Sequence, residues 1–163
     1  MPFSKEHIYE ALSEIPDPEI PVISITDLGV IRNIELQSET AIELKITPTY
    51  SGCPAMQQIE SDVRKKLQSL GFSDITIHTI YSPPWTTDWI NAAAKERLRA
   101  YGIAPPEHTT EDKSWLTGKE KTVKCPRCRS ANTRLISQFG STACKALYQC
   151  QDCLEPFDYF KCI

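Results

Sequence analysis

Apolar residues recur at helical spacing in three stretches of the first hundred residues. The first stretch predicts a helix that opens after Ser4, a good N-cap, and ends before Pro16. The second predicts a helix from Pro54, which suits a first helical position, to a C-cap at Gly71. The third predicts a helix over residues 87–101.

A two-residue alternation of apolar and polar side chains predicts strands in the same part of the chain. Residues 41–46 alternate isoleucine or leucine with glutamate or lysine, as a strand with one buried face does. Less regular runs at 30–36 and 75–81 predict two further strands. The polar segment 37–40 is suited to a hairpin turn that joins the first two strands.

Composition changes after this region and divides the chain into three parts. Residues 103–122 hold prolines, charges and hydroxyl side chains, which indicate a linker. We therefore predict a domain at 1–102, a linker at 103–122 and a C-terminal module at 123–163. Strand-like runs at 133–137 and 146–149 predict a hairpin in that module.

The C-terminal module contains two Cys-x-x-Cys pairs at the spacing of a metal-binding ribbon, Cys125 and Cys128 with Cys150 and Cys153. Four thiolates that converge on one tetrahedral ion favour zinc, and a rubredoxin-like iron site or a pair of redox thiols is the alternative. Such a module is too small to depend on a hydrophobic core, so a structural metal would supply roughly 10 kcal/mol of folding free energy.

One departure from the usual knuckle sequence concerns the residue after the second cysteine of each pair. Glycine is frequent there, but this chain has Arg129 and Leu154. These residues are expected to loosen the knuckle geometry without removing a ligand. The remaining Cys144 and Cys162 are expected to be small buried residues.

Charge and hydropathy narrow the functional classes. The net charge is −3 and the pI is about 5.6, so no general nucleic-acid binding is expected. A local basic run at 119–134 is the exception, and a nucleic-acid-binding ribbon is the weaker reading of it. The first residues lack the apolar core of a signal peptide, and no apolar run is long enough to span a membrane. Seven cysteines are an odd number, which does not suit a framework of disulfide bonds. A cytoplasmic protein is expected.

Two further features offer candidate functional side chains. Cys53 stands before Pro54 at the start of a predicted helix, where the helix dipole stabilises a thiolate; a buried, inert cysteine is the equal alternative. Asp17 and Glu19 lie in a loop stiffened by three prolines, which would hold their carboxylates in place. The residues alone favour a simpler reading, in which Asp17 caps backbone donors of a turn.

These loops carry a resemblance to known families. Three segments together resemble a domain shared by iron-sulfur targeting factors of the MMS-nineteen-interacting type and the bacterial SUF-T factor. They are Asp-Pro-Glu-Ile-Pro-Val at 17–22, Ile-Thr-Asp-Leu-Gly at 25–29, and residues 47–55, which include a Cys-Pro pair. With the string at 139–148 and the segment at 155–162, the whole chain resembles the PaaD family of phenylacetate-degradation proteins. The resemblance implies an α+β fold, a small mixed sheet with helices on one side, followed by a zinc ribbon.

The resemblance also implies a role beside phenylacetyl-CoA epoxidase in aerobic phenylacetate catabolism. A non-catalytic maturation factor that helps to insert an iron-sulfur cluster or iron is the first hypothesis, with Cys53 as a transient metal ligand near Asp17 and Glu19. The expected client is the iron-sulfur reductase component, and a homodimer is one way to complete the ligand set. One structural zinc is expected besides this cargo. The alternative hypothesis is a stoichiometric structural subunit of the epoxidase.

Overall fold

The computed structural model describes residues 3–49, 52–105, 123–140, 142 and 145–160. The chain forms two compact units, residues 1–85 and residues 86–163, which are described separately below. No described helix has the length and apolar character that a bilayer crossing requires.

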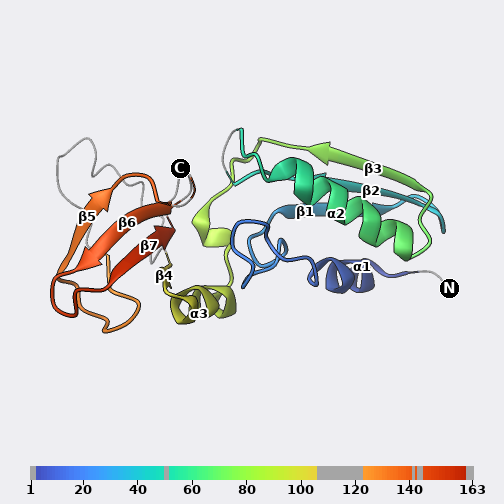
Figure 1. Cartoon of the computed structure of the whole chain (residues 1–163). Helices are drawn as coiled ribbons and strands as arrows, with labels where there is room; N and C mark the ends of the chain where they lie inside the picture. Colours follow the sequence, from blue (N-terminus) through green and yellow to red (C-terminus); the bar gives the residue numbers. More distant parts are fainter. Residues whose placement is uncertain (1–2, 50–51, 106–122, 141, 143–144, 161–163) are drawn as a thin grey trace. The chain divides into compact units, whose positions relative to one another are not determined.

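The first unit contains a three-stranded sheet in the order β1-β2-β3 (Figure 1). Strands β1 (Ile31–Leu36) and β2 (Ala41–Ile46) form the predicted antiparallel hairpin, with a bulge at the start of β1. Strand β3 (Asp74–Thr79) pairs with β2 in parallel. The predicted mixed sheet is therefore confirmed.

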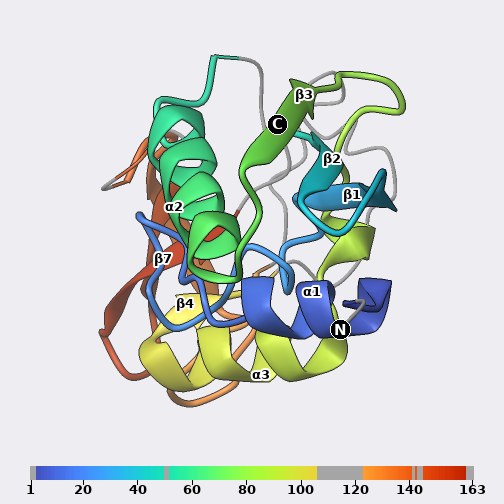
Figure 2. The same cartoon turned by 90° about the vertical axis from the view of Figure 1, so that its right-hand side faces the viewer.

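Helices α1 (Lys5–Leu12) and α2 (Met56–Ser69) accompany this sheet, and α2 connects the parallel strands β2 and β3. Figure 2 shows α2 running alongside the sheet. The side chain of Ser4 accepts a hydrogen bond from the His7 N–H at 3.2 Å, which is the predicted N-cap. The core combines one face of β2 with one stripe of each helix, and its members include Ile8, Leu12, Ile42, Leu44, Ile46, Ile59, Val63 and Leu67.

The second unit has a four-stranded sheet in the order β4-β7-β6-β5. Its strands are β4 (Ile103–Ala104), β5 (Thr133–Ser137), β6 (Lys145–Cys150) and β7 (Pro156–Phe160). The predicted β5–β6 hairpin is present, and β7 pairs with β6 in the antiparallel sense and with β4 in parallel. Together the two units give the predicted α+β class followed by a ribbon.

The predicted helix at 87–101 is divided in two in the structure. A short 3-10 helix, η1 (Thr87–Trp89), is followed by α3 (Ala92–Tyr101). The break occurs at Ile90 and Asn91, whose backbones are extended, because the Asn91 side chain accepts a hydrogen bond from the Ala94 N–H at 2.7 Å and starts α3 as its N-cap.

Two strands were not expected from the sequence. Ile103 and Ala104 open the predicted linker but form β4, and their two residues are too few for any periodicity to reveal. Strand β7 follows the second cysteine pair directly and becomes a central strand only by pairing with β4, which lies far earlier in the chain. Residues 106–122 of the predicted linker lie outside the described residues, as do Cys144 and Cys162. The division at residue 102 stays a prediction.

Candidate functional site

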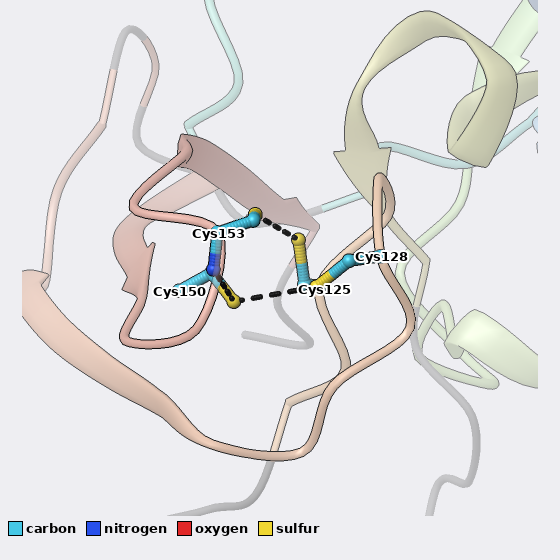
Figure 3. Close-up of side chains that lie close together, drawn as sticks. All are labelled: Cys125, Cys128, Cys150 and Cys153. Carbon is cyan, nitrogen blue, oxygen red and sulfur yellow. Dashed lines mark hydrogen bonds between the residues drawn. The ribbon is translucent and has the colours of Figure 1, made fainter.

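The four predicted cysteine ligands converge at one end of the second sheet (Figure 3). The Sγ atoms of Cys125 and Cys153 are 3.7 Å apart, and those of Cys128 and Cys150 are 3.5 Å apart. All four sulfurs lie within 4.8 Å of one another. A tetrahedral zinc with Zn–S distances of about 2.3 Å places its sulfurs about 3.8 Å apart. The arrangement therefore fits one metal ion held by four thiolates.

Each cysteine pair is held by a tight backbone turn. In the first knuckle the Arg129 N–H donates to the Cys125 carbonyl at 2.9 Å, and the Cys125 N–H donates to the Ser130 carbonyl at 2.9 Å. In the second knuckle the Cys150 N–H donates to the Glu155 carbonyl at 2.9 Å. These turns bring both thiols of a pair to the same side, as ligation of one ion requires.

The residues after the second cysteines have the backbone conformation that glycine favours. Arg129 and Leu154 both have a φ of 65°, and they are the non-glycine residues with positive φ in the described ranges. The left-handed conformation costs roughly 1–2 kcal/mol for a residue with a Cβ atom. The absence of glycine therefore leaves the backbone conformation of the knuckles unchanged, but it adds backbone strain at Arg129 and Leu154.

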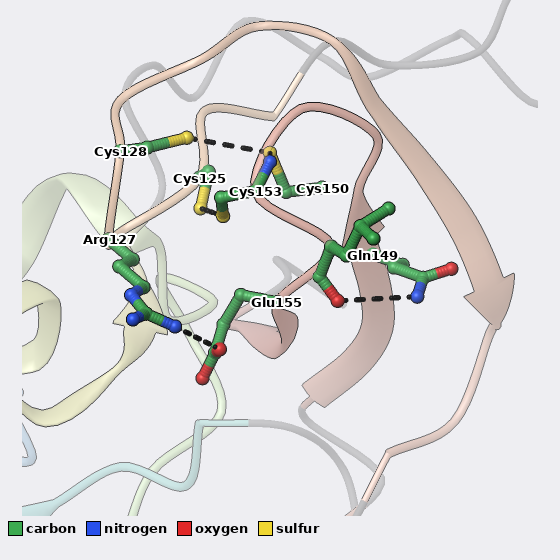
Figure 4. A network of polar contacts seen from close by, with 8 residues as sticks. Cys125, Arg127, Cys128, Gln149, Cys150, Cys153 and Glu155 are labelled. Atoms are coloured by element: carbon green, nitrogen blue, oxygen red, sulfur yellow. Dashed lines mark hydrogen bonds and ion pairs between the residues drawn. The ribbon is translucent and has the colours of Figure 1, made fainter.

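Side chains around the site join the two knuckles. Asp152 of the second knuckle accepts hydrogen bonds from the Ser130 hydroxyl and, at 3.0 Å, from the Asn132 side chain. These hydrogen bonds hold the pKa of Asp152 below its ordinary value. Arg127 and Glu155 form an ion pair at 2.7 Å across the two tips (Figure 4). The knuckles are thus oriented relative to each other by polar contacts outside the sulfur cluster.

The electrostatics of the thiols indicate why the cluster needs a cation. The backbone N–H of Cys153, 3.4 Å from the Cys150 sulfur, is the main reason that the pKa of Cys150 is lowered to about 7. The Ser130 N–H acts in the same direction on Cys128, but desolvation and the neighbouring thiols outweigh it and raise the pKa of Cys128 to about 12. Four thiolates this close therefore need a bound divalent cation to offset their mutual repulsion.

Below the cluster, the ribbon has a small core of aromatic side chains. The ring of Tyr148 stacks on Phe157 at 6.0 Å between centroids and meets the edge of Tyr159 at 5.7 Å. Cys125 and Cys150, both with no exposed surface, belong to the same buried cluster. Two of the four candidate ligands are consequently part of the packing of the module, so metal binding and folding are coupled.

Cys53 belongs to the first unit and is not a member of this cluster. It is half-buried, and its carbonyl accepts the Met56 N–H at 3.3 Å in the turn that leads into α2. The N-cap residue Ala55 makes no side-chain capping bond, so the first N–H groups of α2 are not satisfied by a side chain there. Within the described residues, Cys53, Asp17 and Glu19 do not form a group of three or more close metal-ligating atoms.

Asp17 is a buried turn residue. Its Oδ1 atom accepts hydrogen bonds from the N–H groups of Glu19 at 2.9 Å and Ile20 at 2.8 Å, while its own N–H donates to the Ile23 carbonyl at 2.9 Å. This is the capping arrangement that the simpler reading of the loop predicts. Glu19 is half-buried, and its role as a functional carboxylate stays a prediction.

Replacing Asp17 with alanine should lower the free energy of unfolding by about 1–3 kcal/mol, because two backbone donors lose their acceptor in a buried turn. Asp17→Asn retains a side-chain oxygen and should recover most of that loss. Urea unfolding of the full chain, followed by circular dichroism, measures both. Equal stability of the alanine variant and the unchanged protein would show that the hydrogen bonds to the Asp17 side chain do not stabilise the fold.

The segment between β2 and α2, which we call the Cys53 loop, begins where strand β2 ends. Strands β2 and β3 are parallel, so the segments that follow them leave from the same edge. The Thr47 N–H donates to the Val30 carbonyl at 2.9 Å, and the indole Nε1–H of Trp85 donates to the Leu28 carbonyl at 2.7 Å. The sequence analysis missed Trp85; the only local signal was an aromatic residue after two prolines.

Two models of known protein families match different parts of this chain. A family model described as iron-sulfur cluster assembly protein matches residues 5–77, and one described as PaaD zinc beta ribbon domain matches residues 109–161. A protein of Escherichia coli (strain K12), which is named as a subunit of 1,2-phenylacetyl-CoA epoxidase, is 51% identical over 96% of this chain and 92% of its own length. The chain belongs to the PaaD family. The predicted family resemblance is thereby confirmed.

Two further similar proteins match only part of this chain. The Fe-S protein maturation auxiliary factor SufT of Staphylococcus aureus (strain USA300) is 32% identical over 50% of this chain and 93% of its own length. A crystal structure titled Domain of Unknown Function DUF59, from Bacillus anthracis, is 28% identical with a TM-score of 0.54, and the match covers 58% of this chain and 90% of that one. The PaaD-family chain thus combines an assembly-type domain with a ribbon.

Proposed function

We propose that this PaaD-family protein is a non-catalytic maturation factor for phenylacetyl-CoA epoxidase that assists insertion of an iron-sulfur cluster or iron. One observation carries the proposal: a single chain joins an iron-sulfur assembly domain to a PaaD ribbon. Its relatives include proteins named as Fe-S maturation auxiliary factors and a protein named as an epoxidase subunit. The client would be the iron-sulfur reductase component, in the cytoplasm.

The two candidate sites have different tasks in this proposal. Four cysteine thiolates fill the coordination sphere of a tetrahedral ion, so the ribbon site retains no open position for chemistry. Its donor set fits zinc, bound by Cys125, Cys128, Cys150 and Cys153, and a metal there supplies folding free energy rather than catalysis. The ribbon would then serve to dock the client.

Cys53 is the proposed contact with the cargo. The half-buried thiol lies in the turn that leads into α2 and is accessible in part, and the N-terminal end of a helix favours a thiolate nearby. One cysteine does not hold a cluster, so the other ligands would come from the client or from a second copy of the chain. Asp17 and Glu19 stay candidate members of this loop site, with Asp17 also needed for the shape of the loop.

The test is to produce the epoxidase components together with Cys53→Ala protein and to measure their iron and acid-labile sulfide. Loading should fall to the level found without the PaaD-family protein. The variant itself should keep its thermal unfolding temperature and one zinc per chain. Cys144→Ala, a cysteine outside the four ligands, is the matched control and should load normally. Undiminished loading by Cys53→Ala would reject the role of this thiol.

A structural subunit of the epoxidase is the second candidate, supported by the name of the Escherichia coli relative. In that case the ribbon and the tryptophan-bearing segment at 103–122 would bridge epoxidase components. The two functions differ after maturation. Epoxidase that is assembled in the presence of this chain and then separated from it should retain activity if the chain is a maturation factor, and should lose it if the chain is a structural subunit.

A further inference from the structure

The tips of the two knuckles carry side chains whose backbone conformation would suit glycine better. Arg129 and Leu154, the residues that we call the knuckle patch, each follow the second cysteine of a knuckle and each have a φ of 65°. Residues held in an unfavourable backbone conformation are concentrated at functional sites, where the side chain has a use that offsets the strain. The question is what these two side chains contact.

Both side chains of the knuckle patch are exposed to solvent. Leu154 is 66% exposed, although the other leucines of the described sheets and helices are buried or half-buried. Arg129 is exposed, and within the described residues its guanidinium makes no hydrogen bond or ion pair. A strained, exposed arginine without an internal ionic partner is typical of an anchor residue at a protein interface, and an exposed leucine can add apolar contact area there.

The two residues lie on the same end of the ribbon. The sulfurs of the preceding residues, Cys128 and Cys153, belong to a cluster whose members are all within 4.8 Å of one another. The ion pair between Arg127 of the first knuckle and Glu155, which follows Leu154, joins the two tips at 2.7 Å (Figure 4). Because each residue of the knuckle patch directly follows one of these two ligands, both residues belong to the metal-binding end of the ribbon.

The charge around the patch indicates the chemistry of its partner. The acidic side chains nearby have partners of their own, because Glu155 pairs with Arg127 and Asp152 accepts from Ser130. The guanidinium of Arg129 therefore adds an uncompensated positive charge. The whole second unit is basic, because it contains twelve Lys and Arg residues and nine Asp and Glu residues. Residues 1–85 are acidic, with six Lys and Arg residues and twelve Asp and Glu residues. An acidic surface is complementary to this end of the chain.

We propose that the knuckle patch docks the ribbon on a client protein, at a surface with a carboxylate for Arg129 beside an apolar pocket for Leu154. The proposal rests on the maturation role proposed above, in which the ribbon holds the client. A protein fits better than a nucleic acid, because the exposed aliphatic side chain of Leu154 has no partner on a phosphate backbone and does not stack on bases as an aromatic ring does.

The test uses full-length Leu154→Gly and Arg129→Gly proteins and measures binding to each purified epoxidase component by biolayer interferometry. Each variant should bind its client about tenfold more weakly, as for the loss of one interface anchor. Each should retain one zinc and an equal or higher unfolding temperature, because glycine relieves the strained backbone. Ile136→Thr changes another exposed apolar residue of the ribbon and should bind normally.

The outcomes separate this proposal from the maturation role. Binding of both glycine variants at the level of the unchanged protein would overturn the docking proposal. Salt-sensitive binding of DNA or RNA that is lost in Arg129→Gly, with no binding of any epoxidase component, would overturn it in favour of a nucleic-acid partner. If Cys53→Ala protein loads the client normally while the glycine variants lose binding, the docking proposal stands and the role of Cys53 in maturation fails.

Discussion

Cys150→Ser protein should lose its metal together with the fold of its ribbon. Cys150 has no exposed surface, ends strand β6 and places its sulfur 3.5 Å from that of Cys128. Serine offers a hydroxyl that does not replace a thiolate as a zinc ligand. Structural zinc contributes about 10–16 kcal/mol of apparent binding free energy in small metal-dependent modules, which exceeds what a small aromatic core supplies alone.

Zinc content by mass spectrometry and amide NMR signals of the second sheet measure this effect. The zinc should fall to a trace, and the dispersed signals of β5, β6 and β7 should collapse, while those of β1, β2 and β3 persist because the first unit contains none of the four cysteines. A strong chelator should have the same effect on the unchanged protein. Cys53→Ser is the matched control and should keep metal and fold; a zinc-free Cys150→Ser ribbon with native signals would contradict the expectation.

The second large effect should come from Trp85. Its indole is buried at 6% exposure and donates to the Leu28 carbonyl at 2.7 Å, between segments 57 residues apart in the sequence. Trp85→Ala removes a large packed side chain and should lower the free energy of unfolding by about 3–5 kcal/mol. Trp85→Phe keeps most of the ring but leaves the carbonyl without this donor, and should lower it by about 1–3 kcal/mol.

Urea unfolding followed by far-ultraviolet circular dichroism separates the two variants, since tryptophan fluorescence changes with the substitution itself. Trp85→Ala should also increase the rate at which Cys53 reacts with a thiol reagent, because Leu28 and Val30 belong to the turn that anchors the start of the Cys53 loop through the Thr47 N–H. A phenylalanine variant as unstable as the alanine variant would show that the hydrogen bond, and not the packing, carries the effect.

Much of the first unit could be predicted from local pattern. The alternation in β2 and the helical spacing in α2 determine which side chains are buried, and the bounds found for these elements differ from the predicted ones by no more than a few residues. The four ribbon cysteines were recognisable because their residue type and spacing are independent of the rest of the fold. For Asp17, in contrast, the sequence left two readings open, and the two backbone donors at its Oδ1 atom support the capping one.

The sequence by itself determined the residues that can bind a metal, the periodicity of the main helices and strands, and the family of the chain. The tertiary structure decided that β4 pairs with β7, that Trp85 holds Leu28, and that Arg129 and Leu154 adopt a left-handed backbone. The physical reason is the range of the interactions. Helical and strand periodicity depend on neighbours a few positions apart, whereas strand pairing, indole hydrogen bonds and knuckle geometry depend on groups that only the folded chain brings together.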